Sequence, residues 1–210
     1  RDRKGTLWEG GIRVPTIIEW PARIREARVS MVPGSTVDIF PTLLEVAGIE
    51  AVKQPQPLDG LSILSLIDGK MTVRAKPMGF WSIPARGQSM RSRQMLAAQW
   101  MAQRNGEPPP SPPNDATQRK ARADAALKIL EKSGLVGHAA WIDNNYKLHR
   151  IPTSKPSLAK YTLYDLAADP AEANDLAGEM PDRVARMKAE LNQWQRSVVR
   201  SIASEDYPPF

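Results

Sequence analysis

The sequence contains no cysteine among its 210 residues. It therefore has no disulfide, no thiolate nucleophile and no cysteine-based zinc site. It also lacks a run of about 18 apolar residues that could span a bilayer, and it shows no charged-then-apolar leader typical of a signal peptide. No internal repeat is evident. These absences exclude cysteine chemistry and predict no membrane-spanning helix in these residues.

Glycine is scarcer than proline, with 13 residues against 19. This balance indicates many turns and connections in a mixed α+β chain rather than a helical bundle. The length suits one domain, or one domain plus a piece of another. The formal net charge of +6 favours an anionic partner. Charge alone leaves nucleic acid, a membrane surface and a sulfated or phosphorylated substrate open.

Helices and turns dominate the pattern before residue 135. A helix is predicted from about Asp38, as its N-cap, to Ala47, with Gly48 as the stop. Its expected apolar face consists of Ile39, Leu43, Leu44 and Val46. The later elements expected here are a helix at 62–67, a strand at 77–82, and helices at 88–104 and 115–133 around a proline-rich segment at 107–113.

Strands are predicted after this helical region. Residues 138–142 and 146–151 alternate apolar and polar side chains, and the Asp-Asn-Asn sequence at 143–145 tolerates the turn of a tight hairpin. A third strand is expected at 161–166 and a long helix at 181–202. The apolar stripe of that helix consists of Val184, Met187, Leu191, Trp194 and Val198. Such a stripe at spacings of three and four predicts a helix that covers a sheet.

Residues 4–15 form the most informative motif, Lys-Gly-Thr-Leu-Trp-Glu-Gly-Gly-Ile-Arg-Val-Pro. It resembles the lysine-glycine and Glu-Gly-Gly-x-Arg-x-Pro signature of type I sulfatases, in the alkaline phosphatase superfamily. Further blocks resemble that family in the same order, at 20–21, 38–48, 58–62 and 163–176. The resemblance covers residues 1–70 and 140–200. It is to the C-terminal portion of an arylsulfatase or N-acetylgalactosamine-6-sulfatase-like enzyme.

This resemblance implies that Lys4 is a catalytic residue that contacts the sulfate group. An ammonium in a water-poor pocket stabilises the charge that develops during sulfate ester cleavage. The alternative is a solvated lysine before a glycine turn. Glu9 and Arg13 are candidate supporting residues that fix the shape of the loop by hydrogen bonding, or they form an ordinary structural ion pair. Gly10 and Gly11 are expected to permit close backbone approaches.

The family's nucleophile and metal site are missing from the positions where they are expected. The nucleophile is a formylglycine made within a Cys/Ser-x-Pro-x-Arg motif, and the calcium is held by upstream carboxylates and an Asn. Ser82-Ile83-Pro84-Ala85-Arg86 fits the serine form of the short motif, but it follows the lysine block, so we interpret it as a chance match. Asp143-Asn144 mimics a calcium-binding pair and is interpreted as a hairpin turn. His138 and His149 are interpreted as structural or exposed.

The resemblance also implies a fold class, α/β with α+β. Residues 1–75 would complete the large alkaline-phosphatase-like catalytic domain. Residues 76–210 would form a C-terminal subdomain, an antiparallel sheet covered by a C-terminal helix, with an insertion at about 86–135. The chain opens with Arg1 rather than Met, and we expect its natural N-terminus to lie upstream.

The resulting hypothesis is a sulfuric ester hydrolase of which these residues are one part. Calcium, formylglycine and the N-terminal part of the catalytic domain would come from upstream sequence, and the fragment alone is predicted to be inactive. A sulfated glycan or small molecule is the expected substrate, and nucleic acid ranks low. The alternative is a non-catalytic polyanion-binding module derived from a sulfatase. The family is largely exported or lysosomal, which implies a periplasmic, extracellular or lysosomal location.

Positive charge is densest in the two predicted middle helices. It is interpreted either as a surface for a polyanion or as solvated helix faces. The residues are Arg86, Arg91, Arg93, Arg104, Arg119, Lys120, Arg122, Lys128 and Lys132.

Overall fold

The computed structural model describes residues 2–50, 58–83, 91–108, 116–154, 158–203 and 205. Its helices and strands are separated by connections of very different length. In order they are α1 (Glu9–Ile12), the 3-10 turn η1 (Thr36–Asp38), α2 (Ile39–Val46), α3 (Leu64–Ile67), β1 (Met78–Ser82), α4 (Arg91–Arg104), α5 (Ala116–Ser133), β2 (His138–Asp143), β3 (Tyr146–Pro152), β4 (Ala159–Asp165) and α6 (Pro181–Ile202).

The four strands form one antiparallel sheet in the order β1-β2-β3-β4. The β2–β3 hairpin pairs Trp141 with Leu148, and Leu148 pairs in turn with Leu163 on β4. Asn144 adopts a left-handed backbone angle, φ 53°, which the tight turn requires. The predicted strands and hairpin are confirmed.

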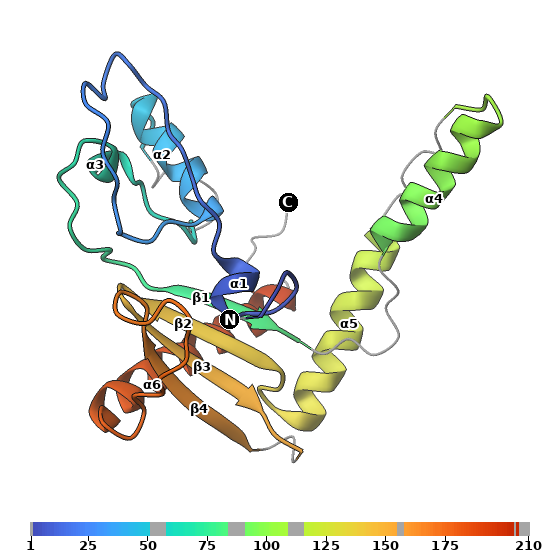
Figure 1. Cartoon of the computed structure of the whole chain (residues 1–210). Helices are drawn as coiled ribbons and strands as arrows, with labels where there is room; N and C mark the ends of the chain where they lie inside the picture. Colours follow the sequence, from blue (N-terminus) through green and yellow to red (C-terminus); the bar gives the residue numbers. More distant parts are fainter. Residues whose placement is uncertain are drawn as a thin grey trace.

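Helix α6 covers one face of this sheet (Figure 1) and has the predicted bounds. Met187 and Leu191 are fully buried against Leu148 and Leu163. Each such side chain contributes about 1.5–3 kcal/mol when it leaves water. A Cβ on Gly79 of β1 would lie 2.5 Å from the Trp194 ring, so the bare glycine backbone lets α6 approach the edge strand.

Helices α4 and α5 project from the sheet as an arm (Figure 1), close to the predicted bounds. Residues 109–113 of the predicted proline-rich joint lie outside the described residues. None of the described helices is both long and apolar enough to cross a membrane. Three of the nine basic residues have described side chains, and all three are exposed; they are Arg104, Lys128 and Lys132.

The segment before β1 departs from the sequence-based expectation at α2. The predicted helix is confirmed, with Asp38 at the N-cap and Ala47 at the C-cap. The Asp38 side chain makes no capping hydrogen bond to α2, because its carboxylate closes the preceding 3-10 turn by accepting the Ser35 N–H at 2.8 Å. Of the predicted apolar face only Leu44 is buried, whereas Ile39, Leu43 and Val46 are exposed. No described element covers that side, and α2 instead turns Thr42 inward to accept the Ile63 N–H at 3.0 Å.

The described elements combine helices with an antiparallel sheet, so the predicted fold class is confirmed. The boundary near residue 75 and the 86–135 insertion stay predictions. Residues 13–35 contain neither helix nor strand.

Candidate functional site

Lys4 lies in a turn that closes on itself and rests on α1. Thr6 donates to the Arg3 carbonyl through its backbone N–H at 3.3 Å and its hydroxyl at 2.9 Å. A Cβ at Gly11 would lie 2.2 Å from the Thr6 carbonyl oxygen, so only glycine permits this packing. The Lys4 side chain is exposed, and no carboxylate in the described part of the chain pairs with it. Its ammonium is therefore available to an anion.

Glu9, the first residue of α1, joins this turn to the sheet. Its backbone N–H donates to Oε2 of Glu172 at 2.7 Å, and its carboxylate accepts from Lys147 Nζ at 2.8 Å. Arg13 approaches the same carboxylate at 3.6 Å from the exposed side. The ion pair between Glu9 and Arg13 is thus present, but the shorter contact of Glu9 is with Lys147. The structure brings Glu9 and Arg13 together and leaves Lys4 in the turn before them.

Four residues form a buried polar group between α1 and the sheet, here called the anchor cluster: Glu9, Lys147, His149 and Glu172. Lys147, His149 and Glu172 are fully buried, and Glu9 is 8% exposed. Oε1 of Glu172 lies 2.9 Å from Lys147 Nζ and 2.7 Å from His149 Nε2. Lys147 and His149 alternate with Leu148 along β3, so they face away from α6. Figure 1 shows α1 and α6 on opposite sides of the sheet.

The aromatic rings around the cluster complete its packing. Trp8 stacks on His149 with ring centroids 4.2 Å apart, and Tyr164 meets His149 edge-on at 5.8 Å. His138 lies 2.9 Å from His149, Nε2 to Nδ1. If His149 donates from Nε2 to the Glu172 carboxylate, its Nδ1 must accept from His138. The chain of hydrogen bonds therefore runs from His138 to Glu172.

The cluster fixes the protonation of its members. Burial opposes ionisation of Glu172, but hydrogen bonds from His149, the Glu9 N–H and Lys147 outweigh it and lower the pKa of Glu172 to about 2. Burial lowers the pKa of His138 to about 4, and the positive charges nearby add to that effect. Burial likewise lowers the pKa of His149 despite its bond to Glu172. At neutral pH the Glu172 carboxylate therefore lies beside the neutral imidazole of His149, which in turn bonds to the neutral imidazole of His138.

A second polar connection joins the α2 region to the hairpin. Arg74 forms a buried bidentate pair with Asp38, at 2.7 and 2.8 Å. The Arg74 backbone N–H donates to Asn144 Oδ1 at 2.6 Å. Burial opposes ionisation of Asp38, but Arg74 and the N–H groups of Leu61 and Ser35 outweigh it and lower its pKa. The segment before β1 is therefore tied to the sheet at two places, through Glu9 and through Arg74.

Of the two chance matches in the sequence, Asp143-Asn144 lies within the described residues, and its contacts are those of a structural turn. Asp143 accepts from Arg186 at 2.8 Å, and Asn144 bonds to the Arg74 backbone, as expected of a structural turn. Ser82 ends β1, and residues 84–86 of its motif lie outside the described residues. Within the described ranges, no three His, Asp or Glu side chains gather so as to hold a metal ion. The described residues therefore do not fit a calcium site.

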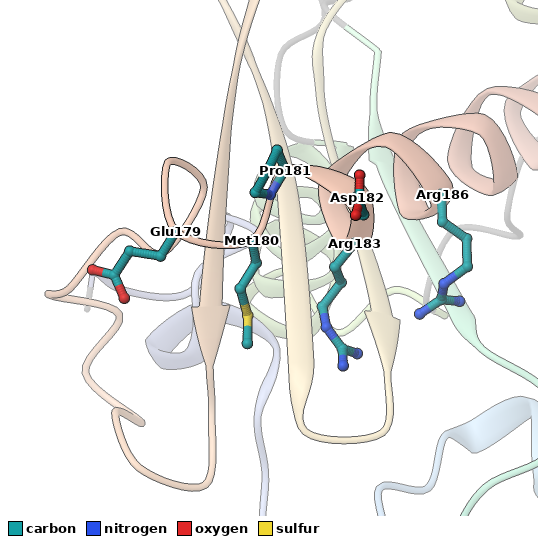
Figure 2. Close-up of a pocket in the computed structure, with 6 residues that line it drawn as sticks. All are labelled: Glu179, Met180, Pro181, Asp182, Arg183 and Arg186. Carbon is teal, nitrogen blue, oxygen red and sulfur yellow. The ribbon is translucent and has the colours of Figure 1, made fainter.

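A shallow hollow at the start of α6 (Figure 2) does not coincide with the anchor cluster. Its two cations are already engaged, since Arg183 stacks on Tyr146 at 3.8 Å and Arg186 pairs with Asp143 and Glu190. We therefore do not assign a function to this hollow. Its lining residues are Glu179, Met180, Pro181, Asp182, Arg183 and Arg186.

Sequence reasoning did not single out Lys147, Glu172 or Trp8, and it left His149 between structural and exposed; His149 is buried. The sequence placed Lys147 and His149 at alternating positions around Leu148, hence on the face opposite Leu148. That pattern is also typical of an antiparallel strand with one face in water, so it did not reveal that these two side chains are buried. Nothing in the pattern named Glu172 as their partner.

Comparison with known proteins finds similarity to sulfatases. Residues 2–95 match the family model of the N-sulphoglucosamine sulphohydrolase C-terminal region. Steryl-sulfatase of Mus musculus is 39% identical over 69 residues, which cover 33% of this chain and 11% of that protein. N-acetylgalactosamine-6-sulfatase of Canis lupus familiaris is 43% identical over 72 residues, covering 34% and 14%.

The matched segments span only 11% and 14% of the length of these two relatives. Likeness to solved structures is weaker. A protein described under the metabolism of multiple glycosaminoglycans by Bacteroides thetaiotaomicron is 16% identical, with a TM-score of 0.37, over 76% of this chain and 24% of that chain.

Proposed function

This chain contains a C-terminal sulfatase portion, and from that premise we propose that the protein to which it belongs hydrolyses sulfate esters, with Lys4 at the reacting sulfate group. The placement of Lys4 carries the proposal. An unpaired, exposed ammonium lies on a short turn, and the glycine packing against α1 fixes that turn. The same residues form the lysine-glycine motif.

The chemistry suits a fixed cation. Cleavage of a sulfate ester develops negative charge on the sulfuryl oxygens and on the leaving oxygen, and a cation that is already in place stabilises this charge without reorganising. Losing one such group costs about 3 to 4 kcal/mol of barrier, roughly a hundredfold to a thousandfold in rate. Lys4 would bind and orient the sulfate through its ammonium.

The attacking group and the metal are proposed to come from other sequence. We place the formylglycine nucleophile and the calcium ligands outside these 210 residues. Calcium would supply charge stabilisation when bound, and no step assigned to this chain passes through it. On this proposal the 210 residues alone do not hydrolyse sulfate esters.

Apolar side chains on the surface support packing of residues 2–75 against a further part of a catalytic domain. Ile17 is 93% exposed and Val29 90%, and the α2 residues Phe40 and Leu43 are 50% and 59% exposed. These exposed apolar side chains support an interaction site in this segment. The occupant proposed here is the N-terminal part of the same catalytic domain.

A carbohydrate sulfate is the proposed substrate class. The net charge of +6 suits a polyanionic chain, and Arg104, Lys128 and Lys132 on the projecting arm are exposed. An exported or lysosomal location would fit such a substrate. The alternative function is a non-catalytic polyanion-binding module, and the experiment with Lys4→Ala distinguishes the two.

The test compares the full-length protein with its Lys4→Ala variant, using 4-nitrophenyl sulfate and a 6-sulfated amino sugar as substrates. We expect Lys4→Ala to lower kcat/KM about a hundredfold to a thousandfold. Lys70→Ala is the matched control, because Lys70 is an exposed lysine of the same segment. A folded full-length protein that binds heparin but hydrolyses neither ester would refute the proposal and leave the binding module.

A further inference from the structure

The Lys4 turn makes no direct described hydrogen bond to the sheet. Its described hydrogen bonds, from Thr6 to Arg3, are internal, and it rests on Gly11 of α1. The turn is therefore held through the residues that follow it, namely α1 and Trp8, whose ring stacks on His149 of the sheet. A helix of four residues is too short to be stable by itself, so its position depends on tertiary contacts.

Those contacts come from Lys147 on β3 and from Glu172 in the loop after β4, and they bind two different groups of Glu9. Glu172 accepts the backbone N–H of Glu9 at 2.7 Å, and Lys147 donates to its carboxylate at 2.8 Å. Because one contact holds the main chain and the other the side chain, together they fix both the place and the orientation of the first turn of α1. The partners are 138 and 163 residues away in sequence.

Stability alone is a poor explanation for this arrangement. Fully buried ion pairs pay a large desolvation cost, and apolar replacements of similar volume are often as stable or more stable. Directional hydrogen bonds, in contrast, define one geometry. The anchor cluster places a fully buried lysine and glutamate under the one helix that carries the Lys4 turn.

We propose that Lys147 and Glu172 are positioning residues, which hold the Lys4 turn where its ammonium meets the sulfate. This inference rests on the proposed role of Lys4. It makes the C-terminal sheet part of the active-site machinery, although none of its residues needs to touch the substrate. Lys147 and Glu172 act through Glu9 and α1.

The deciding experiment is a double-mutant cycle in the full-length protein. Lys147→Met keeps the length of the stem and removes the ammonium. In the wild-type background we expect kcat/KM to fall roughly tenfold to a hundredfold, because a displacement of about 1 Å is enough for such a loss. In the Lys4→Ala background the same substitution should change kcat/KM less than about twofold, because its effect passes through Lys4.

Glu172→Gln is the second variant, for the case that Lys147→Met does not fold. It keeps the shape of the side chain but has one acceptor oxygen in place of two, so it cannot accept from the Glu9 N–H and from Lys147 and His149 at the same time. Arg186→Met is the matched control, since it also removes a cation with two carboxylate partners in this half of the molecule, far from α1 in the hydrogen-bond network. It should leave kcat/KM unchanged in both backgrounds.

Equal losses in the two backgrounds would overturn the inference, since a role in stability alone lowers the active fraction whether or not Lys4 is present. A second readout separates this inference from the proposed function. Trypsin cleavage after Lys4 should be faster in Lys147→Met and Glu172→Gln than in wild type and Arg186→Met. Unchanged trypsin cleavage in both variants would refute the positioning of the Lys4 turn by Lys147 and Glu172. An unchanged kcat/KM for Lys4→Ala would instead refute the proposed function.

Discussion

The part of the molecule from β1 to α6, here called the sheet half, and the segment before β1 differ in the kind of side chain that is fully buried. In the sheet half, Leu148, Leu163, Met187 and Leu191 are completely buried. In the segment before β1, the best-buried large apolar side chains belong to residues such as Leu44, still 8% exposed, while others stand almost fully in solvent. The fully buried side chain there is polar, Asp38.

This difference shows what holds each half in place. An apolar core of interlocking side chains stabilises the packing of α6 on the sheet. Before β1 the fixed points are polar, namely the Asp38–Arg74 pair and the Glu9 contacts. Hydrogen bonds define positions well but leave the apolar surface of that segment uncovered.

We expect the largest loss of stability in the segment before β1 from a substitution at Asp38. Asp38→Asn should destabilise the protein by about 3–5 kcal/mol, because it leaves the buried Arg74 guanidinium without its carboxylate. The free energy of unfolding from urea titration checks this. Asp68→Asn, which removes an exposed partner of Arg23, should cost much less. Similar losses for both would mean that the buried pair does not hold the segment.

Leucine-to-alanine substitutions in the two parts of the molecule should differ in their cost to stability. Leu191→Ala should cost about 2–5 kcal/mol, because it opens a cavity in a fully packed core. Leu43→Ala, at a position 59% exposed, should stay within about 0.5 kcal/mol in the 210-residue chain. In the full-length protein Leu43→Ala should cost more, if that surface is covered as proposed. Equal costs for Leu43→Ala in the two proteins would contradict that packing.

Local pattern was sufficient to predict the sheet half. The apolar stripe from Val184 to Val198 has helical spacing, and the alternation around the Asn144 turn has strand spacing, so both elements form as predicted. The same spacing correctly predicted helix α2, but it did not predict that the apolar side chains of Ile39 and Leu43 are exposed. Periodicity shows that a helix has an apolar face, but it does not say whether the covering element lies within the chain.

The candidate site could be predicted only in part, for a related reason. The lysine-glycine motif is contiguous, so it pointed to Lys4, Glu9 and Arg13. The partners of Glu9 lie far along the chain, and pairing between such distant positions is set by the fold rather than by local sequence. Glu172 also has a left-handed backbone angle, φ 55°, which no local pattern indicated.

The smallest expected effect is the acid sensitivity of the anchor cluster. The pKa of His138 is lowered from 6.5 to about 4 in the folded protein, so between these pH values the unfolded chain binds more protons and stability falls as pH falls. His149 has the same direction of shift. The pKa of Glu172 is lowered from 4.5 to about 2, so its contribution is lost over that lower range.

His138→Asn isolates one part of this dependence. The charged and titratable groups that act on His138 are His149, Lys147, Glu172 and Asp2. Urea midpoints at about pH 7 and about pH 5 should differ less in the variant than in wild type, because one proton-binding group has been removed. Identical differences would mean that His138 is not held neutral by the fold. His138 hydrogen-bonds to His149, and its ring lies 5.7 Å from that of Trp8. The contacts of Glu9 with Lys147 and Glu172 do not involve His138, so its substitution should leave them in place. The slope of stability against pH should then change without faster trypsin cleavage after Lys4.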